Sequence, residues 1–403
     1  MRTPEIDVLS SHVYATGVPY AQLAHLRCYA PVFRQEIPDP QLLDEAWVIT
    51  RAADVRTISM RPEIFSSSSG VALRRYRTAE GKRLDVGNFI NLDDPEHRLL
   101  RNLVGKGFTP RIIRRFEQDY RGLAETIVAD ALRQNTFDFV TEISAELPLL
   151  AICKLLGVPE ADREKFFRWS NVLLGAEDPE YTLSPTELAD IVVEFREYVL
   201  ELVQARRAHP REDILSVLAT ATPGEALTDD EIAGFALLLM LAGNETTRNN
   251  ISHGLIALME NPEQWHALRG DPRLLDSAVE EIIRWAAPVN YMVRTVMRDT
   301  ELHGVKLREG ERVAMMYASA NRDEDLYTDG DAFDITRPDQ RHLSFGIGPH
   351  FCLGAHLARI ETKVVFAELL KRVDRFHLAG PIRRLESSFI HGIKHLPVTA
   401  QRF

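Results

Sequence analysis

The chain has few cysteines, and this scarcity excludes one class of protein. Only Cys28, Cys153 and Cys352 occur among its 403 residues, and they lie far apart. Small secreted domains that depend on disulfides carry their cysteines densely, so this chain is not a disulfide scaffold. We therefore expect a reducing compartment, and the cytoplasm is the predicted location.

Long apolar runs and an excess of positive charge are also missing. The longest apolar run, residues 235–243, is too short to cross a membrane, and residues 1–33 lack the pattern of a secretory signal. The formal net charge of -11 argues against general binding to nucleic acids. The chain also shows no internal repeat and no linker rich in glycine or serine. We therefore expect a soluble protein with one domain over residues 1–403.

The most informative stretch present is Phe345–Gly354, which reads FGIGPHFCLG. Its cysteine, Cys352, comes directly before residues 353–370, whose composition predicts a helix. The start of a helix offers unpaired N–H groups and the positive end of the helix dipole. We expect this position to lower the pKa of the thiol and to suit a thiolate that binds metal. Gly354 projects no side chain, which leaves room for a flat group.

A lone cysteine before a helix is usually a small buried apolar residue, and we interpret Cys28 and Cys153 in this way. The pattern around Cys352 is far more specific. It resembles the haem-ligand loop of the cytochromes P450, in which a cysteine thiolate holds the iron. The resemblance implies that Cys352 is the metal ligand of haem b. It also implies haem contacts from the rest of the loop, namely Phe345, Gly346, His350 and Gly354.

A second motif lies in a long predicted helix, residues 228–260. Its first half is apolar and is followed by AGNETT, although a buried helix has no structural need for glycine, an acid and two threonines. A simple kink is the alternative interpretation. The resemblance implies that Ala242 and Gly243 let the helix pass close over the haem. It also implies that Glu245 and Thr246 are the acid–alcohol pair of the oxygen-activation site.

Basic residues supply a third motif. His97 and Arg101 are four residues apart on a predicted helix and therefore share a face. Without further context they would be a pair of basic residues facing solvent. Members of the family carry His and Arg at this spacing to bind a haem propionate. Arg294, within the strand-like segment 289–297, stands where the family places another propionate ligand.

The fourth motif is a charged pair on a predicted helix, residues 276–286. Glu281 and Arg284 lie three residues apart and share a face, as many surface pairs do. The resemblance implies instead a buried cluster of Glu281, Arg284 and Arg337 that steadies the region behind the haem.

The resemblance covers residues 47–397 and implies a mainly helical fold with small β-sheets. The haem would lie between the long helix and the helix after Cys352. The implied reaction is monooxygenation, in which one atom of O2 enters a C–H bond and the other leaves as water. Electrons would come from NAD(P)H through a separate ferredoxin and its reductase. A peroxide-driven peroxygenase and a non-catalytic haem-thiolate sensor or carrier remain as alternatives.

The expected substrate is a lipophilic small molecule of the terpenoid, steroid or fatty-acyl type, because the expected pocket is chiefly apolar. The stretch AGNETTRN resembles members that hydroxylate sterol side chains and branched lipids. Residues 175–181 are predicted to form a mobile lid. The expected pocket residues are Val86, Phe89, Ile90, Leu238, Leu241, Asn290, Tyr291, Met292, Val293, Phe389 and Ile390.

Overall fold

The structure of the protein is a computed structural model. It describes residues 6–39, 42–74, 89–105, 108, 110–181, 183–221, 227–338 and 341–403. The expected pocket residue Val86 lies outside these ranges. Within them, no helix combines the length and the hydropathy needed to span a bilayer.

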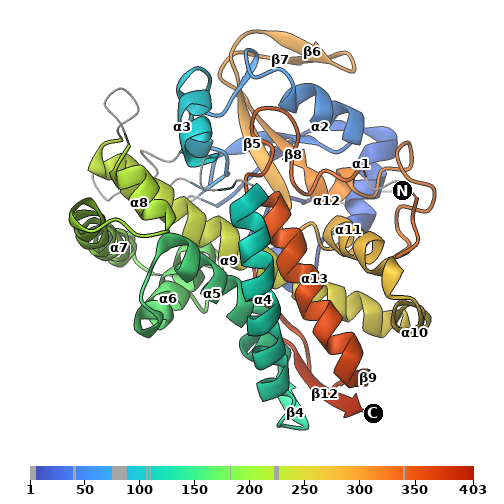
Figure 1. The fold of residues 1–403 in the computed structure, drawn as a ribbon. Coiled ribbons are helices and arrows are strands. Elements are labelled where there is room, and N and C mark those ends of the chain that lie inside the picture. Colours follow the sequence, from blue (N-terminus) through green and yellow to red (C-terminus); the bar gives the residue numbers. More distant parts are fainter. Residues whose placement is uncertain are drawn as a thin grey trace.

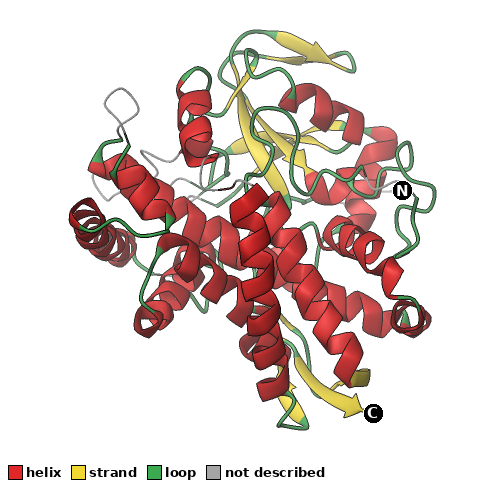
Figure 2. Ribbon diagram, in the orientation of Figure 1, coloured by secondary structure: helices red, strands yellow, loops and turns green. Residues whose placement is uncertain are grey.

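Helices make up most of the described chain, which confirms the predicted mainly helical fold (Figures 1 and 2). Their bounds are α1 (Tyr20–Tyr29), α2 (Ala52–Ser59), α3 (Glu96–Gly105), α4 (Pro110–Ala131), α5 (Glu146–Leu156), α6 (Arg163–Leu174), α7 (Pro185–Ala208), α8 (Ile214–Ala219), α9 (Asp229–Glu260), α10 (Pro262–Gly270), α11 (Leu275–Ala286), α12 (Tyr317–Ala320) and α13 (Ala355–Arg372).

The strands form small sheets, as predicted. The largest sheet has the order β1-β2-β8-β5-β3, with β2 and β8 parallel and its other neighbours antiparallel. Its strands are β1 (Val32–Glu36), β2 (Glu45–Ile49), β8 (Arg312–Met316), β5 (Tyr291–Val296) and β3 (Phe65–Ser66). A three-stranded sheet has the order β4 (Thr136–Asp138), β12 (Pro397–Arg402), β9 (Val373–Leu378). Two further sheets have two strands each. One pairs β6 (Thr300–Leu302) with β7 (Val305–Leu307), and the other pairs β10 (Arg383–Arg384) with β11 (Ile393–His395).

Helix α9 is the central element. Its N-terminus is a capping box, in which the Thr228 hydroxyl accepts from the Glu231 N–H at 3.2 Å and the Glu231 carboxylate accepts from the Thr228 N–H at 2.8 Å. The helix continues for 32 residues, about 48 Å at 1.5 Å per residue, and stops before Pro262. It contacts α5, α6, α7, α11 and α13, so it runs through the middle of the helical part of the molecule.

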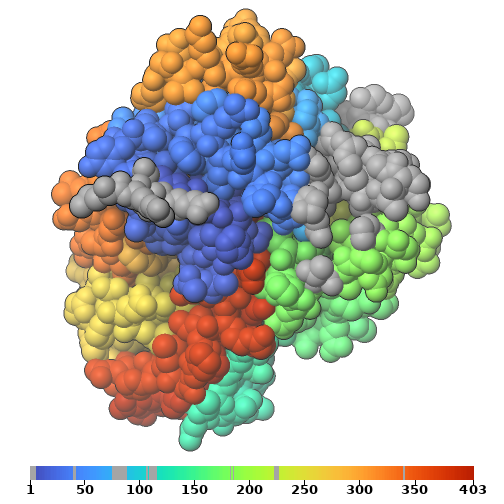
Figure 3. Space-filling view, turned by 180° about the vertical axis from the view of Figure 1, so that it is seen from behind, coloured from blue at the N-terminus to red at the C-terminus, as the bar shows by residue number. Residues whose placement is uncertain are grey.

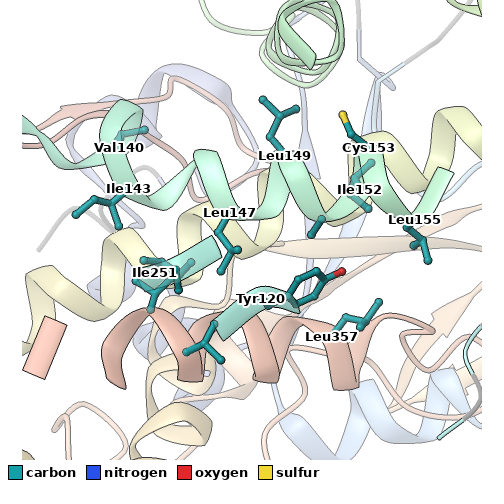
Figure 4. Packing of buried hydrophobic residues seen from close by; sticks show 14 of the residues in the cluster. Tyr120, Val140, Ile143, Leu147, Leu149, Ile152, Cys153, Leu155, Ile251 and Leu357 are labelled. Atoms are coloured by element: carbon teal, nitrogen blue, oxygen red, sulfur yellow. The ribbon is translucent and has the colours of Figure 1, made fainter. Parts of the chain in front are cut away.

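The core has a large helical part and two smaller parts on the faces of the five-stranded sheet. Figure 4 shows the helical part, where Tyr120 of α4 lies between α5 and α13, beside Leu357. From behind, the N-terminal segment (blue) packs against residues near 300 (orange) (Figure 3). The sheet therefore lies beside the helices that surround α9, and the two parts meet near the cysteine loop.

The Glu281 cluster links α11 to the segment before that loop. Both side chains of the Glu281–Arg284 pair are fully buried, with N–O distances of 2.6 and 2.7 Å. The guanidinium Nε of Arg337 lies 3.3 Å from the Glu281 carboxylate. Arg284 also donates to backbone carbonyls, including that of Asn321 at 2.7 Å. The three residues therefore form one buried network rather than a surface pair.

Candidate active site

A large cavity lies between α9, α13 and the five-stranded sheet. It contains about 1330 Å³ of space free of protein atoms, its open mouth included. Cys352, Thr246 and Arg101 all line it, although they come from three separate segments of the chain. Most other lining side chains are aliphatic or aromatic. The cavity therefore combines a thiol, an alcohol and a cation inside an apolar enclosure.

A tight loop holds Cys352 at the cavity wall. The Cys352 N–H donates to the carbonyl of Phe345 at 2.9 Å, which closes the loop. Gly346 and Gly348 have φ values of 65° and 78°, in the left-handed region that favours glycine. A Cβ at Gly348 would lie 2.6 Å from the carbonyl oxygen of Ser59, so a side chain is also excluded there by contact. The Cys352 thiol is open to the cavity and has protein around its other sides.

The expected lowering of the Cys352 pKa is wrong for the protein groups alone. Burial raises the pKa of this thiol and outweighs the lowering by the N–H groups of Gly354 and Ala355 and by Arg101 and Arg359. The helix N-terminus therefore acts in the expected direction, but desolvation is stronger. A metal cation beside the sulfur is the further positive charge that would favour the thiolate.

Basic side chains gather along one edge of the cavity. Arg101, Arg294 and His350 line it, and the ring of His97 lies 4.0 Å from that of His350 between centroids. His97 is buried, and its Nε2 has no hydrogen-bond partner among the described residues. Arg294 is buried, donates to the carbonyl of Val293 at 2.8 Å, and forms no ion pair with any described carboxylate.

Burial disfavours the charged form of each of these groups. Burial lowers the pKa of His350 to about 3, helped by Arg294, His97 and Arg101. Burial also lowers the pKa values of Arg294 and Arg101. Among the described residues, Arg101 and Arg294 donate only to backbone carbonyls, those of Phe351 and Val293, so an anionic group beside them would stabilise their charged forms. A flat group with carboxylates along one edge, such as haem, fits these residues with Cys352 as its ligand.

Helix α9 forms the opposite wall through Ala242, Gly243 and Thr246. A Cβ on Gly243 would lie 2.2 Å from Cδ1 of Ile152, so this glycine admits the side chain of α5. Ala242 is exposed to the cavity. The Thr246 hydroxyl faces the cavity and donates to the Ala242 carbonyl at 2.6 Å. Gly243 thus both admits the side chain of Ile152 and forms part of the cavity surface with Ala242 and Thr246.

Glu245 does not line the cavity, unlike Thr246. Its buried carboxylate forms an ion pair with Arg248 and accepts from Asn249 Nδ2 at 2.9 Å. Arg248 in turn donates to the Asn171 side chain of α6 at 2.8 Å. The structure therefore does not bring the acid and the alcohol together at the cavity, because successive helical residues point in different directions.

Four of the expected pocket residues, Phe89, Ile90, Leu238 and Met292, line the cavity. The neighbours of Met292 do not, because side chains alternate along strand β5. Tyr291 and Val293 face the other side of the sheet and pack in the core with α1 and the N-terminal segment.

The remaining expected pocket residues also lie elsewhere. The side chain of Asn290 donates to the Ser388 carbonyl at 3.0 Å. Phe389 packs on Tyr291, with ring centroids 5.4 Å apart, and Ile390 is buried. Leu241 packs against the main helical core. The side chains of these residues pack in the protein core or form hydrogen bonds, so they do not reach the cavity.

Several lining residues were not predicted. On α13, residues 354, 357, 358 and 361 recur at helical spacing, so extending the face of Gly354 along the helix would have found Glu361. On α9, Asn250 lies one turn after Thr246 in the same way. The principal unpredicted lining residues are Phe108, Ile152, Leu155, Leu239, Thr247, Asn250, Pro288, Val289, Tyr317, Leu357 and Glu361.

The expected mobile lid, residues 175–181, is held in place by hydrogen bonds. Asp178 is buried and accepts from the Glu386 N–H at 2.8 Å and from Lys394 Nζ at 2.9 Å. Glu177 accepts from the Ser388 N–H at 3.0 Å. The segment between α6 and α7 is therefore tied to the segment around residue 388.

Known proteins resemble this chain over almost its full length. A family model described as cytochrome P450 matches residues 165–379. A steroid C26-monooxygenase of Rhodococcus jostii (strain RHA1) is 39% identical over 402 residues, which cover 97% of this chain and 84% of that protein. A methyl-branched lipid omega-hydroxylase of Mycobacterium tuberculosis (strain ATCC 25618 / H37Rv) is 41% identical over 362 residues, which cover 88% and 83%.

Solved structures agree in fold. A Mycobacterium marinum cytochrome P450 in complex with pseudoionone superposes with a TM-score of 0.90 at 35% identity, covering 99% of each chain. CYP109E1 of Bacillus megaterium in complex with testosterone superposes with a TM-score of 0.84 at 33% identity, covering 94% of this chain and 97% of the other.

Proposed function

Because the chain belongs to the cytochrome P450 family, we propose that it is a haem-thiolate monooxygenase that hydroxylates the aliphatic side chain of a steroid or a methyl-branched lipid. The observation that carries the proposal is one largely apolar cavity lined by Cys352, Thr246 and the basic side chains Arg101, Arg294 and His350. The two curated relatives, whose names specify a steroid and a branched lipid, supply the substrate class.

The roles of the residues follow from their positions. Cys352 is the proposed iron ligand, and His97, Arg101, Arg294 and His350 are the proposed partners of the haem propionates, through charge-assisted hydrogen bonds. When bound, haem supplies the chemistry that activates O2 for insertion of one atom into a C–H bond. The hydroxyl of Thr246 would hold a water molecule at the cavity wall by hydrogen bonding. Arg248 and Asn249 hold Oε1 of Glu245, and its Oε2 has no hydrogen-bond partner among the described residues.

The substrate wall favours a neutral, lipophilic molecule. Phe89, Ile90, Leu238, Leu239 and Met292 contribute apolar surface to the cavity. Burial of such surface favours binding by about 25 cal/mol per Å². The charged lining residues among those described are the basic edge and Glu361. A hydrocarbon side chain therefore matches this wall better than a charged ligand does.

Electrons are proposed to arrive from NAD(P)H through a separate ferredoxin and reductase. Arg98 is exposed on α3, the helix from which Arg101 donates to the carbonyl of Phe351 in the cysteine loop, and positive side chains here would attract an acidic ferredoxin. Arg359 contributes less, because it forms an ion pair with Glu280 at 2.9 Å. The peroxygenase and the sensor or carrier are the competing proposals.

The test combines binding and turnover. Purified haem-loaded protein is titrated with a steroid bearing a branched aliphatic side chain, a methyl-branched lipid and an unbranched lipid of equal length. A spin-state change and a terminally hydroxylated product, formed with a ferredoxin system, are the expected results. Product formed with hydrogen peroxide alone would favour the peroxygenase. Binding without product under either condition would favour the sensor or carrier.

A further inference from the structure

A second, smaller cavity lies between the C-terminal part of α9, α10 and β9. It contains about 530 Å³ of space free of protein atoms, its open mouth included. Its lining residues share no member with the lining of the cavity that holds Cys352. Cys352 precedes α13 and β9 follows it, so this helix of 18 residues, about 27 Å long, separates Cys352 from β9 (Figure 1). None of the proposed roles uses this second cavity.

The floor of the second cavity is apolar. The floor residues, each at most 5% exposed, are Leu255 and Leu258 of α9, Trp265 of α10 and Phe376 of β9. The rings of Trp265 and Phe376 meet edge to face, with centroids 5.9 Å apart. The indole N–H of Trp265 already donates to the carbonyl of Asp374 at 2.8 Å, so it needs no water from the cavity. An apolar floor beside open space favours an apolar occupant over water.

The rim of the second cavity is basic. His266 of α10 and Arg375 and His377 of β9 line it and are exposed. None of the described lining residues is acidic, and Asp374, the acid of β9, is paired with Arg269 at 2.6 Å instead. The rim thus presents a guanidinium and two imidazoles without a carboxylate in the lining, although the whole chain has a formal net charge of -11.

We propose that the second cavity binds a small aromatic carboxylate, with its ring against Trp265 and Phe376 and its carboxylate at the basic rim. The planar guanidinium of Arg375 matches the two oxygens of a carboxylate, and bonds between charged groups are stronger than neutral ones. Aromatic rings on the floor favour a ring in the ligand, through edge-to-face and offset contacts. The site does not depend on the proposed monooxygenase function, because no residue of the haem cavity takes part.

The two cavities differ in the ligand that they favour. The second cavity has less than half the volume of the first, 530 against 1330 Å³, so it suits a smaller molecule. A neutral ligand would leave the charge of Arg375 unused, and a cationic ligand would be repelled by it. Charge complementarity therefore selects an anion, and the apolar floor selects one with a hydrocarbon body.

The first experiment locates the ligand, with naphthoate as the probe. Haem-loaded protein carrying isotope-labelled tryptophan is titrated, and the indole N–H resonances are followed by NMR, with Trp265→Phe identifying the resonance of Trp265. Naphthoate should shift this resonance in a saturable manner. The other three tryptophans, which do not line the second cavity, serve as internal controls. The absorption spectrum of the haem reports on the first cavity in the same sample.

The second experiment tests the role of charge. Naphthylmethanol, the neutral analogue, should bind at least about tenfold more weakly than naphthoate, because it cannot accept charge-assisted bonds. A double variant with Arg375→Gln and His377→Gln should lower the affinity for naphthoate to that for the alcohol. It should leave the affinity for the alcohol unchanged. Arg402→Gln is the matched control, because Arg402 is exposed on the neighbouring strand β12 and lies outside the lining.

Four results would overturn the proposal. These are no shift of the Trp265 resonance at the solubility limit of naphthoate, a response of the haem spectrum alone, equal affinity for the two probes, and unchanged naphthoate binding in the double variant. A Trp265 resonance that depends on protein concentration without naphthoate would assign the second cavity to contact between copies of the chain, which also contradicts it. Loss of hydroxylation would remove the proposed function alone, since the resonance is measured without turnover.

Discussion

At the scale of single residues, burial decides the chemistry of the cavity. It raises the pKa values of Cys352 and Glu361 and lowers those of His350 and Arg294, because each charged form loses water. A metal cation would therefore stabilise the thiolate of Cys352, and an anionic group would stabilise the charged forms of the basic side chains. Haem brings both to the cavity in one ligand. This complementarity is the physical reason to place haem here.

The first prediction concerns Cys352. The ferrous–carbonyl complex of the wild type should show the red-shifted Soret band of a thiolate ligand, and Cys352→His should lose it. The imidazole can still bind iron but donates less electron density than a thiolate does. Cys153→Ser is the control, because that cysteine is buried in the helical core, and it should keep the band. Retention of the band in Cys352→His would remove the assignment.

The second prediction concerns Thr246, whose hydroxyl faces the cavity. Thr246→Ala should keep haem content and substrate affinity, because a smaller side chain still fits. More reducing equivalents should end as hydrogen peroxide and fewer as hydroxylated product, since the hydroxyl no longer orients water. Product and peroxide are measured per NAD(P)H consumed, with Thr246→Ser as the conservative control. Equal coupling in Thr246→Ala and wild type would contradict the role.

At the scale of elements, fixed faces of helices and strands decide which residues reach the cavity. On β5, Met292 and Arg294 point to the cavity, whereas Tyr291 and Val293 point to the core on the other side. On α11, Glu281 and Arg284 point inward to the same buried network. Each element therefore separates residues that act on the ligand from residues that support the fold.

The third prediction tests the two faces of β5. Met292→Ala should alter substrate affinity and spin-state response with little loss of stability, because Met292 borders open space. Val293→Ala should lower the free energy of unfolding by about 2 kcal/mol, since Val293 is fully buried, and should leave affinity unchanged. The measurements are ligand titration and chemical denaturation. A loss of stability in Met292→Ala together with altered affinity in Val293→Ala would show that Val293, not Met292, faces the cavity.

The fourth prediction concerns the pair on α11. Glu281→Ala should cost about 3–5 kcal/mol of stability, because it leaves Arg284 buried without its partner, and little haem-loaded protein should accumulate. Glu45→Ala removes the exposed ion pair with Arg34 and should cost far less stability, because solvent screens this pair. Denaturation midpoints and haem content are compared in both variants. Equal losses would indicate that the buried pair is no more important than the surface pair.

At the scale of the whole molecule, contacts between distant segments close the structure. Residues 175–181 are tied to the C-terminal segment through Asp178 and Lys394. Burial would raise the pKa of Asp178, but the hydrogen bonds from Glu386 and Lys394 overcome this and lower it below 3.8. The tie therefore adds stability above pH 3.8 and loses it as the pH falls through the lower folded-state pKa.

The fifth prediction tests this tie. Lys394→Met should speed hydrogen–deuterium exchange in residues 175–181, because Asp178 loses its cation and the segment opens more often. Lys371→Met removes the ion pair of the exposed Lys371 with Glu368 on α13 and should not change exchange in residues 175–181. Substrate association should quicken in Lys394→Met if this segment gates the cavity. Unchanged exchange would show that backbone contacts alone hold it.

The sequence by itself determined the family, the ligand cysteine and the principal helices, because these depend on local patterns. The loop FGIGPHFCLG combines glycines that adopt positive φ with a cysteine before a helix, and its pattern needs no distant contact. Likewise, the capping box at Thr228 and the apolar run that follows specify the start and the burial of α9. Helical spacing alone places Arg101 on the face of His97.

Only the tertiary structure decided what each of these side chains meets. It engages Glu245 with Arg248 while Thr246 faces the cavity, and it brings Glu361, nine residues beyond Cys352, to the cavity wall. It also reverses the expected pKa shift of Cys352, since desolvation depends on every segment packed around the sulfur. Burial and contacts between elements are sums over residues far apart in the chain, and no local pattern contains them.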